Sequence, residues 1–423
     1  MLPDQVSVLV AGGGASGFMT AIVAAEAGVA DVHLLEATPE PLSKVRISGG
    51  GRCNVTHACW DPRSLVGHYP RGSKALRGPF SRFATGDAVA WFADHGLDLV
   101  EEPDGRLFPR SNSSASVIEV LRRSAQRCGV QVHLGQALHQ VRRLQGDGFA
   151  CELRQGGRST KLRCRHLVLA TGAHPSGRQL ALALGHRIVP PVPSLFSLTL
   201  QVPALQALAG VVMDPVDLEL RLDSALVEQA CYRQSGVVLI THRGLSGPAL
   251  LRLTAFAARD LKTTAYQGTL RVNWAGGLSA TELQQRLDQA RQEQARRQLG
   301  GWRPWGELSR RLWLHLLATA GIDPQLRWAD LRRQHQQRLV EGLTSSTYPV
   351  VGRGPFGDEF VTAGGVDLGE INLATMTSRV CPGLQVVGEL LDVDGVTGGF
   401  NFQHCWTSGW LAAQALATEA SVH

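Results

Sequence analysis

The chain has 423 residues, of which 44% are hydrophobic, enough for two or three domains with cores of their own. No apolar run approaches the roughly 20 residues of a membrane-spanning helix, and the N-terminus lacks the basic segment of a secretory signal. We therefore expect a cytoplasmic protein with no membrane partner. The formal net charge is +6, yet only four of the 42 basic residues are lysine, and charge alone does not indicate a nucleic-acid partner.

The eight cysteines are scattered along the chain, and no two of them form a C-x-x-C pair. This pattern argues against a structural zinc site, a thioredoxin-like redox pair and the disulfide framework of a secreted protein. We expect reduced thiols and no bound metal.

The first predicted elements are those of a nucleotide-binding fold. Residues 6–10 form an apolar run, 18–27 are suited to a helix, and 32–35 are apolar again. This order predicts a strand, a tight turn, a helix and a second strand.

A glycine-rich loop, Gly12-Gly13-Gly14-Ala15-Ser16-Gly17, stands between the first strand and the helix. Gly12 allows a tight turn, Gly14 lets phosphates approach the backbone, and Gly17 lets helix and strand pack closely. We predict that this loop, with Ala15 and Ser16, binds the pyrophosphate of a dinucleotide.

Glu36 ends the second strand, 19 residues after Gly17. A carboxylate at this place accepts hydrogen bonds from the adenosine ribose, and it would repel a 2′-phosphate. The position therefore favours FAD or NAD over NADP.

A second glycine-rich loop follows at residues 44–56. Its backbone can approach a planar ring or a pyrophosphate, while Arg46 and Arg52 neutralise charge. A flexible surface loop is the alternative interpretation. The predicted cofactor contacts in this loop are Lys44, Arg46, Ser48, Gly49, Gly50, Arg52, Cys53 and Asn54.

Apolar strands recur at 166–170 and at 385–387, so the nucleotide-binding domain is predicted to be discontinuous. The insertion begins after the proline cluster at 190–193, which cannot continue a helix or a central strand. We predict four sections: an N-terminal segment of the FAD domain (1–192), a β section of the insert (193–276), a helical section of the insert (277–348) and a C-terminal segment of the FAD domain (349–423).

The β section of the insert alternates apolar and polar residues in four segments, as antiparallel strands of a small sheet or barrel do. From Ser279 a capping box with Glu282 opens a stretch of about three helices that reaches Glu341. This stretch holds 11 arginines and seven acidic residues. We interpret it as a solvated helical face over a core of tryptophans, with a polyanion-binding surface as the alternative. The four strands are expected at 197–202, 217–222, 237–241 and 268–274, and the tryptophans are Trp302, Trp305, Trp313 and Trp328.

Near the C-terminus, Gly388-Glu389 follows the last apolar strand, and Gly398-Gly399-Phe400-Asn401 precedes a helix expected at 402–417. A helix N-terminus aimed at the pyrimidine edge of an isoalloxazine would stabilise the negative charge of a reduced flavin. A flavin needs this arrangement and a nicotinamide does not, so the predicted cofactor is FAD.

His404 and Cys405 lie on the first turn of that helix, where either could contact substrate or donate a proton. A helix N-terminus lowers the pKa of a thiol, which would make Cys405 reactive. The alternative is a packed cysteine beside a histidine with its hydrogen bonds satisfied. Asp392 and Asp394 form a carboxylate pair that we expect to orient ribityl hydroxyls or a loop.

The chain resembles the bacterial BaiN-like and YhiN-like FAD-dependent flavoproteins, often labelled aminoacetone-oxidase-type or NAD(P)/FAD-dependent oxidoreductases. The resemblance covers essentially the whole length. Besides the first loop, it is carried by Ile47 to Asn54, Ala170-Thr171-Gly172-Ala173, Thr241 to Pro248, Thr362 to Val366 and Gly388 to Gly395.

The resemblance implies a glutathione-reductase-type FAD domain of α/β class, interrupted by a barrel-like and helical insert. It implies that Glu389 binds the ribityl chain, and that Gly399, Phe400 and Asn401 lie along the flavin. It also adds Thr171, Gly172 and Gly388 to the cofactor contacts. Cys405 stands where relatives are expected to carry a small residue such as alanine.

The predicted function is an FAD-dependent oxidoreductase that transfers a hydride between a small organic substrate and the flavin. The sequence holds no second G-x-G-x-x-G after a strand, so a dedicated NAD(P)H domain is not evident. The redox partner of the flavin could be a nicotinamide, oxygen or another acceptor. One alternative is a flavin-dependent protein that modifies tRNA, suggested by the pI near 9.0 and the arginine-rich helices. Another is a non-enzymatic flavin-binding redox partner.

Overall fold

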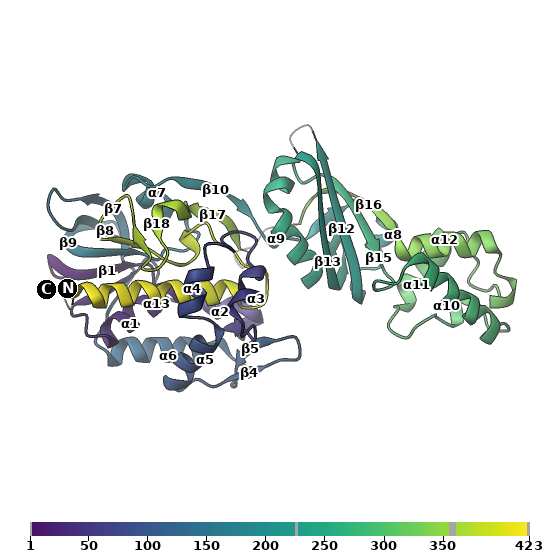
Figure 1. Cartoon of the computed structure of the whole chain (residues 1–423), viewed down its shortest axis with the longest axis horizontal. Helices are drawn as coiled ribbons and strands as arrows, with labels where there is room; N and C mark the ends of the chain where they lie inside the picture. The colour runs from purple at the N-terminus through teal and green to yellow at the C-terminus, as the bar shows by residue number, and fades with distance from the viewer. Residues whose placement is uncertain (1, 225–226, 355–360, 421–423) are drawn as a thin grey trace. The chain divides into compact units, whose positions relative to one another are not determined.

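The computed structural model describes residues 2–224, 227–354 and 361–420. It divides the chain into two compact units (Figure 1), of which unit 1 comprises Met1–Pro191 and Val361–His423 and unit 2 comprises Val192–Phe360. Among the described residues, no helix has both the length and the apolar character needed to cross a membrane.

The elements that surround the insert in the sequence are both strands and helices. They are β1 (Gln5–Ala11), α1 (Ala15–Glu26), β2 (Val32–Glu36), α2 (Ser43–Gly51), β3 (Thr56–His57), α3 (Pro62–Leu65), α4 (Arg77–Arg82), α5 (Thr85–Asp94), β4 (Leu99–Glu101), β5 (Arg106–Pro109), α6 (Ser114–Arg127), β6 (Gln131–Leu134), β7 (Ala137–Arg143), β8 (Phe149–Gln155), β9 (Arg158–Leu169), α7 (Pro175–Ala183), β10 (Ile188–Pro193), β17 (Thr362–Val366), β18 (Ile371–Asn372), β19 (Thr377–Ser378), β20 (Leu384–Val386) and α13 (Phe400–Ala420).

A mixed sheet forms the centre of unit 1. The main run of its strands has the order β18-β19-β20-β9-β1-β2-β6, and the last five of these run parallel. β8 pairs antiparallel with β9, and β7 pairs antiparallel with β8. β1 is the central parallel strand, and its residues from Val8 to Ala11 are all buried. Its valines and leucine suit a strand that is covered on both faces.

Helices from the two ends of the chain pack against each other in unit 1, as the purple α1 and yellow α13 of Figure 1 show. A Cβ atom at Gly409 of α13 would lie 2.8 Å from the backbone oxygen of Ser16 and 3.0 Å from Cβ of Met19. Glycine at this position therefore permits the close approach of α13 to α1.

Unit 2 contains a closed six-stranded barrel with the strand order β11-β14-β13-β12-β15-β16. Along β12, Leu218 and Leu220 are buried and the intervening Glu219 is not, which is the alternation expected of a barrel wall. The elements are β11 (Leu198–Leu200), α8 (Pro203–Gln206), β12 (Val212–Ser224), β13 (Val227–Thr241), β14 (Gly244–Ser246), α9 (Pro248–Thr263), β15 (Gly268–Asn273), α10 (Ala280–Glu293), α11 (Arg310–Thr319), α12 (Arg333–Thr344) and β16 (Ser346–Arg353).

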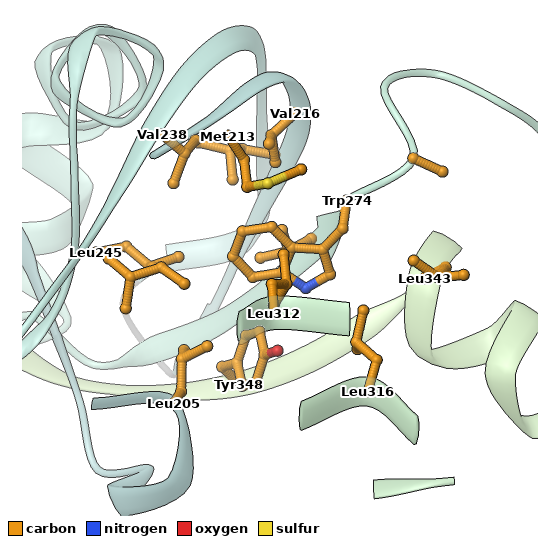
Figure 2. Packing of buried hydrophobic residues seen from close by; sticks show 14 of the residues in the cluster. Leu205, Met213, Val216, Val238, Leu245, Trp274, Leu312, Leu316, Leu343 and Tyr348 are labelled. Atoms are coloured by element: carbon orange, nitrogen blue, oxygen red, sulfur yellow. The ribbon is translucent and has the colours of Figure 1, made fainter. Parts of the chain in front are cut away.

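The barrel and the helices α10, α11 and α12, which lie between its strands β15 and β16, share one hydrophobic core (Figure 2). Trp274, directly after β15, is buried among Met213 and Val216 of the β12 strand and Leu312 and Leu316 of α11. Because this core is continuous, the predicted β and helical sections of the insert lie in one compact unit.

The predicted fold class, a discontinuous Rossmann-type domain with an inserted barrel and helices, is confirmed. The capping box before α10 forms as expected, with Ser279 N–H donating to Glu282 at 2.8 Å. The expected boundary at residues 348 and 349 falls inside β16, which completes the barrel by pairing with β15 and β11. This strand was not predicted from the sequence, and neither was α9, which follows the turn at Gly247.

Candidate functional site

The glycine loop after β1 has the shape that a phosphate-binding turn requires. A Cβ atom at Gly12 would lie 2.3 Å from the backbone oxygen of Ala170, and one at Gly17 would lie 1.9 Å from the oxygen of Gly12. Both positions are therefore restricted to glycine by contacts inside the protein. A Cβ atom at Gly14 would meet no heavy atom within 4 Å, so the loop is open on that side.

Helix α1 begins at this open side. Gly14 is its N-cap residue and provides no side-chain hydrogen bond, and its first turn contains no acidic residue. The N–H groups of a first helical turn have no partner within the helix, and they carry the positive end of its dipole. A pyrophosphate at this place would satisfy them, so the loop fits the phosphates of FAD.

Glu36 is held at the end of β2, beside the same loop. Its Oε2 accepts a hydrogen bond from Gly13 N–H at 3.0 Å, and its Oε1 accepts two from Thr38, each at 2.8 Å. A carboxylate has about four acceptor positions, so capacity remains for a ribose hydroxyl.

A segment from the C-terminal region of the chain, Gly388-Glu389, lies against the first glycine loop. A Cβ atom at Gly388 would lie 2.4 Å from Oγ of Ser16, and one at Gly172 would lie 3.7 Å from Oε2 of Glu389. The same Glu389 oxygen accepts a hydrogen bond from Nζ of Lys44 at 2.7 Å. The structure thus brings together predicted cofactor residues from four separate segments.

The start of α13 is fixed by hydrogen bonds from neighbouring loops. Oη of Tyr69 donates to the backbone oxygen of Phe400 at 2.5 Å. The side-chain amide of Asn401 donates to the oxygen of Gly395 at 2.9 Å and accepts from its N–H at 2.8 Å. Asn401 therefore braces the loop before the helix, and its predicted contact with the flavin would come from its backbone.

The second glycine-rich segment is a kinked helix. Ser48, Gly49 and Gly50 have non-helical backbone angles inside α2, and the two glycines are left-handed. Arg52 donates to Glu102 at 2.6 Å and lies 3.9 Å from the centre of the Phe108 ring. This arginine has structural partners within the protein, and its contact with the cofactor stays a prediction.

The cysteines near the site are not activated. Burial raises the pKa of both the Cys53 and Cys405 thiols to about 12, and the carboxylate of Glu389 adds to the effect at Cys405. Of the two interpretations of Cys405, the one in which the helix N-terminus lowers its pKa is wrong, because burial outweighs the helix dipole here, and this burial agrees with a packed cysteine. Neither thiol supplies a thiolate at neutral pH.

His404 is buried, and burial lowers its pKa to about 4. Its Nε2 lies 3.2 Å from the backbone oxygen of Gly388, a group that can only accept, so Nε2 carries the proton. The ring is therefore neutral at pH 7 and its N–H is engaged. It is poorly suited to the role of proton donor that its sequence position suggested.

Three buried polar atoms of predicted site residues lack a hydrogen-bond partner among the described residues. They are Oδ1 of Asn54, Oγ1 of Thr171 and Nδ1 of His404. Buried polar groups are almost always paired in folded proteins, so orphaned atoms at a predicted cofactor site support the presence of a bound group there. With the open side of Gly14, they indicate that these residues fit FAD.

A buried ion pair and two histidines near the start of α13 were not predicted from the sequence. Arg71 forms a bidentate ion pair with Asp394, whose side chain is fully buried. His68 stacks on Phe400 at 4.2 Å between ring centres, and Nδ1 of His57 donates to the oxygen of Gly398 at 3.2 Å. Arg71 and His68 carry no local sequence signal, because their partners lie more than 300 residues away.

Comparison with known proteins agrees with this geometry. Residues 6–415 match the profile of the family described as HI0933-like protein Rossmann domain. The chain belongs to this family. The resemblance inferred from the motifs is confirmed, and so are FAD as the cofactor and an FAD-dependent oxidoreductase as the enzyme class.

Two curated relatives span nearly the whole chain. The 3-dehydro-bile acid delta(4,6)-reductase of Clostridium scindens is 29% identical over 425 residues, which cover 96% of this chain and 98% of that protein. The ribosomal RNA dihydrouridine synthase of Escherichia coli is 29% identical over 443 residues, which cover 99% and 100%. Among solved structures, the FrdA chain of E. coli quinol fumarate reductase shares the fold, with a TM-score of 0.50, 14% identity and coverage of 100% and 71%.

A glycine-to-alanine substitution tests the phosphate loop. We expect Gly14→Ala to fold normally, because its Cβ meets no protein atom, and to lower FAD affinity at least about tenfold, because the methyl group occupies the phosphate side. Gly78→Ala is the matched control, since a Cβ there is also unobstructed. Flavin content and reconstitution of the stripped proteins measure the effect, and normal FAD affinity in Gly14→Ala would contradict the assignment.

The buried His404 predicts a pH-dependent stability. Its pKa is lowered to about 4, so between pH 6.5 and 4 the unfolded chain binds the proton more tightly and stability falls as the pH falls. The loss amounts to about 3 kcal/mol at pH 4 and is absent above pH 6.5. Urea unfolding with excess FAD should show a shallower pH dependence in His404→Gln, and an unchanged slope would speak against this.

Proposed function

We propose that this protein is an FAD-dependent reductase that adds a hydride and a proton to a carbon–carbon double bond conjugated with a carbonyl group. The observation that carries the proposal is the convergence of the Gly12–Gly17 loop, the Glu389–Lys44 pair and the start of α13 in unit 1. When bound there, FAD supplies the hydride chemistry.

The names of the relatives support this substrate class. One is a delta(4,6)-reductase of a 3-dehydro-bile acid, and the other is a synthase of dihydrouridine. Both names describe saturation of a double bond that a nearby carbonyl polarises. A shared chemistry on different substrates agrees with a common flavin domain whose substrate contacts differ.

The residues of unit 1 would position FAD along its length. Backbone N–H groups of the first loop would bind the pyrophosphate, Glu36 the adenosine ribose and Glu389 the ribityl chain. The N-terminus of α13 would stabilise negative charge on the pyrimidine edge. The proposed contacts are Gly12, Gly14, Ala15, Ser16, Gly17, Glu36, Lys44, Arg46, Ser48, Gly49, Gly50, Arg52, Cys53, Asn54, Thr171, Gly172, Gly388, Glu389, Gly399, Phe400 and Asn401.

Water is the proton source in this proposal. Cys405 has a raised pKa, and the single N–H of neutral His404 is donated to Gly388, so neither residue is poised to protonate a substrate. The Glu389 carboxylate is already engaged as an acceptor by Nζ of Lys44 at 2.7 Å. A soluble reductant such as NADH or NADPH would supply the electrons to the flavin. The predicted location of the protein is still the cytoplasm.

Anaerobic titration of the holoprotein tests both half-reactions. We expect NADH or NADPH to bleach the flavin band, and an α,β-unsaturated ketone to restore it with formation of the saturated product. Oxygen should restore the band in a parallel sample without that product. Protein whose reduced flavin is reoxidised by oxygen but by no conjugated double bond would contradict the proposal.

A second candidate places the double bond in a uracil ring of RNA. It is favoured by the names of the relatives from E. coli and Haemophilus influenzae and by the arginine content of the helical section of unit 2. Mass spectrometry of nucleosides from treated RNA would show uridines that have gained two hydrogens. RNA that stays unchanged with the fully reducible holoprotein would eliminate this candidate.

A further inference from the structure

Six arginines of unit 2 gather where α10 ends and α12 begins. The backbone after α10 lies beside the turn before α12, because the N–H groups of Trp328 and Ala329 donate to the oxygens of Arg297 and Ala295 at 3.0 and 3.1 Å. A bridge between Gln298 and Arg327 continues this pairing. The arginine surface consists of Arg291, Arg296, Arg297, Arg327, Arg332 and Arg333, and all six are exposed.

These guanidinium groups are not neutralised by the protein. Within the described residues of the chain, none of the six forms an ion pair within 4 Å. Arg291 donates to the backbone oxygen of Ala329 at 3.2 Å, which fixes its side chain without cancelling its charge. Six cations in one place, with no carboxylate paired to them, concentrate positive potential.

Three carboxylates lie within three residues of these arginines in the sequence, namely Asp288, Glu293 and Asp330. Asp288 accepts hydrogen bonds from the amide side chains of Gln284 at 3.3 Å and Gln336 at 2.7 Å. Glu293 accepts from Gln289 at 2.7 Å. Asp288 and Glu293 therefore bind neutral amide side chains and not arginines, and the exposed Asp330 forms no ion pair within 4 Å among the described residues.

The placement of Arg332 and Arg333 is unfavourable for the helix that they start. Arg332 is the N-cap residue of α12 and Arg333 its first residue, and the first turn contains no acid. Positive side chains at a helix N-terminus oppose the helix dipole and reduce stability. An anion bound across the arginine surface would remove this repulsion.

We propose that the arginine surface binds the phosphate backbone of folded RNA. Guanidinium groups bind phosphate oxygens with two parallel N–H donors, and a run of cations on two adjacent segments suits a chain of phosphates better than a single small anion. Sequence-independent phosphate contacts of this kind position a nucleic acid for a reaction elsewhere on the protein. The inference deepens the second candidate function and rests on it only for the fate of the bound RNA.

Fluorescence anisotropy with the holoprotein and a fluorescein-labelled RNA hairpin tests this surface. Arg296→Gln combined with Arg327→Gln should weaken binding about tenfold at physiological salt and reduce the slope of log affinity against log salt by about 2. The matched control is Arg142→Gln combined with Arg154→Gln, which removes the same charge from exposed positions of unit 1. This control should bind like the unchanged protein.

Two results would overturn the proposal: no RNA binding at low salt, or equal loss of affinity in both double variants. Flavin absorbance and turnover of an α,β-unsaturated ketone are measured on the same samples. They should be unchanged in both variants, so a failure of RNA binding is distinguishable from a failure of the reductase. Loss of the flavin band would show misfolding, and Arg297→Gln with Arg333→Gln then replaces the first pair.

Discussion

The close packing of α1 against α13 is the constraint on which the site depends. It brings helices from opposite ends of the chain together, and it requires small residues such as Gly409 over Ser16. In the proposed binding mode, the positive end of α1 would face the pyrophosphate of FAD and that of α13 the pyrimidine edge of its flavin. The barrel and helices of the insert form a core of their own, so this packing does not depend on them.

The charges near the predicted flavin site and those of the arginine surface differ in their partners. In unit 1, charges near the predicted flavin are paired: Lys44 with Glu389, Arg52 with Glu102 and Arg71 with Asp394. Removing one partner of a buried pair such as Arg71–Asp394 leaves an uncompensated charge, which makes these pairs suited to hold loops in place. In the helical section of unit 2, the six arginines of the arginine surface have no such partners among the described residues. This contrast is why we assign them to a ligand and not to the fold.

The features that were predictable from the sequence are those encoded locally. The Gly12–Gly17 loop and the capping box before α10 were visible because their chemistry lies within a few residues. Contacts between distant parts of the chain could not be predicted. Nothing in the sequence links Arg71 to Asp394. The predicted domain boundary at residues 348 and 349 divided β16, because Tyr348 and Val350 pair with strands far away in the sequence to complete the barrel. The raised pKa of Cys405 was not predictable either, because the burial that raises it depends on tertiary packing.

The central claim is that FAD lies where the first glycine loop meets the returning C-terminal segment. A crystal structure of the holoprotein with FAD is the most direct measurement. It should show the pyrophosphate within hydrogen-bond distance of the backbone N–H groups at Gly14 to Ser16, and the pyrimidine edge of the flavin against the first turn of α13. A flavin bound away from these two helix starts, or one held by unit 2 alone, would contradict the account.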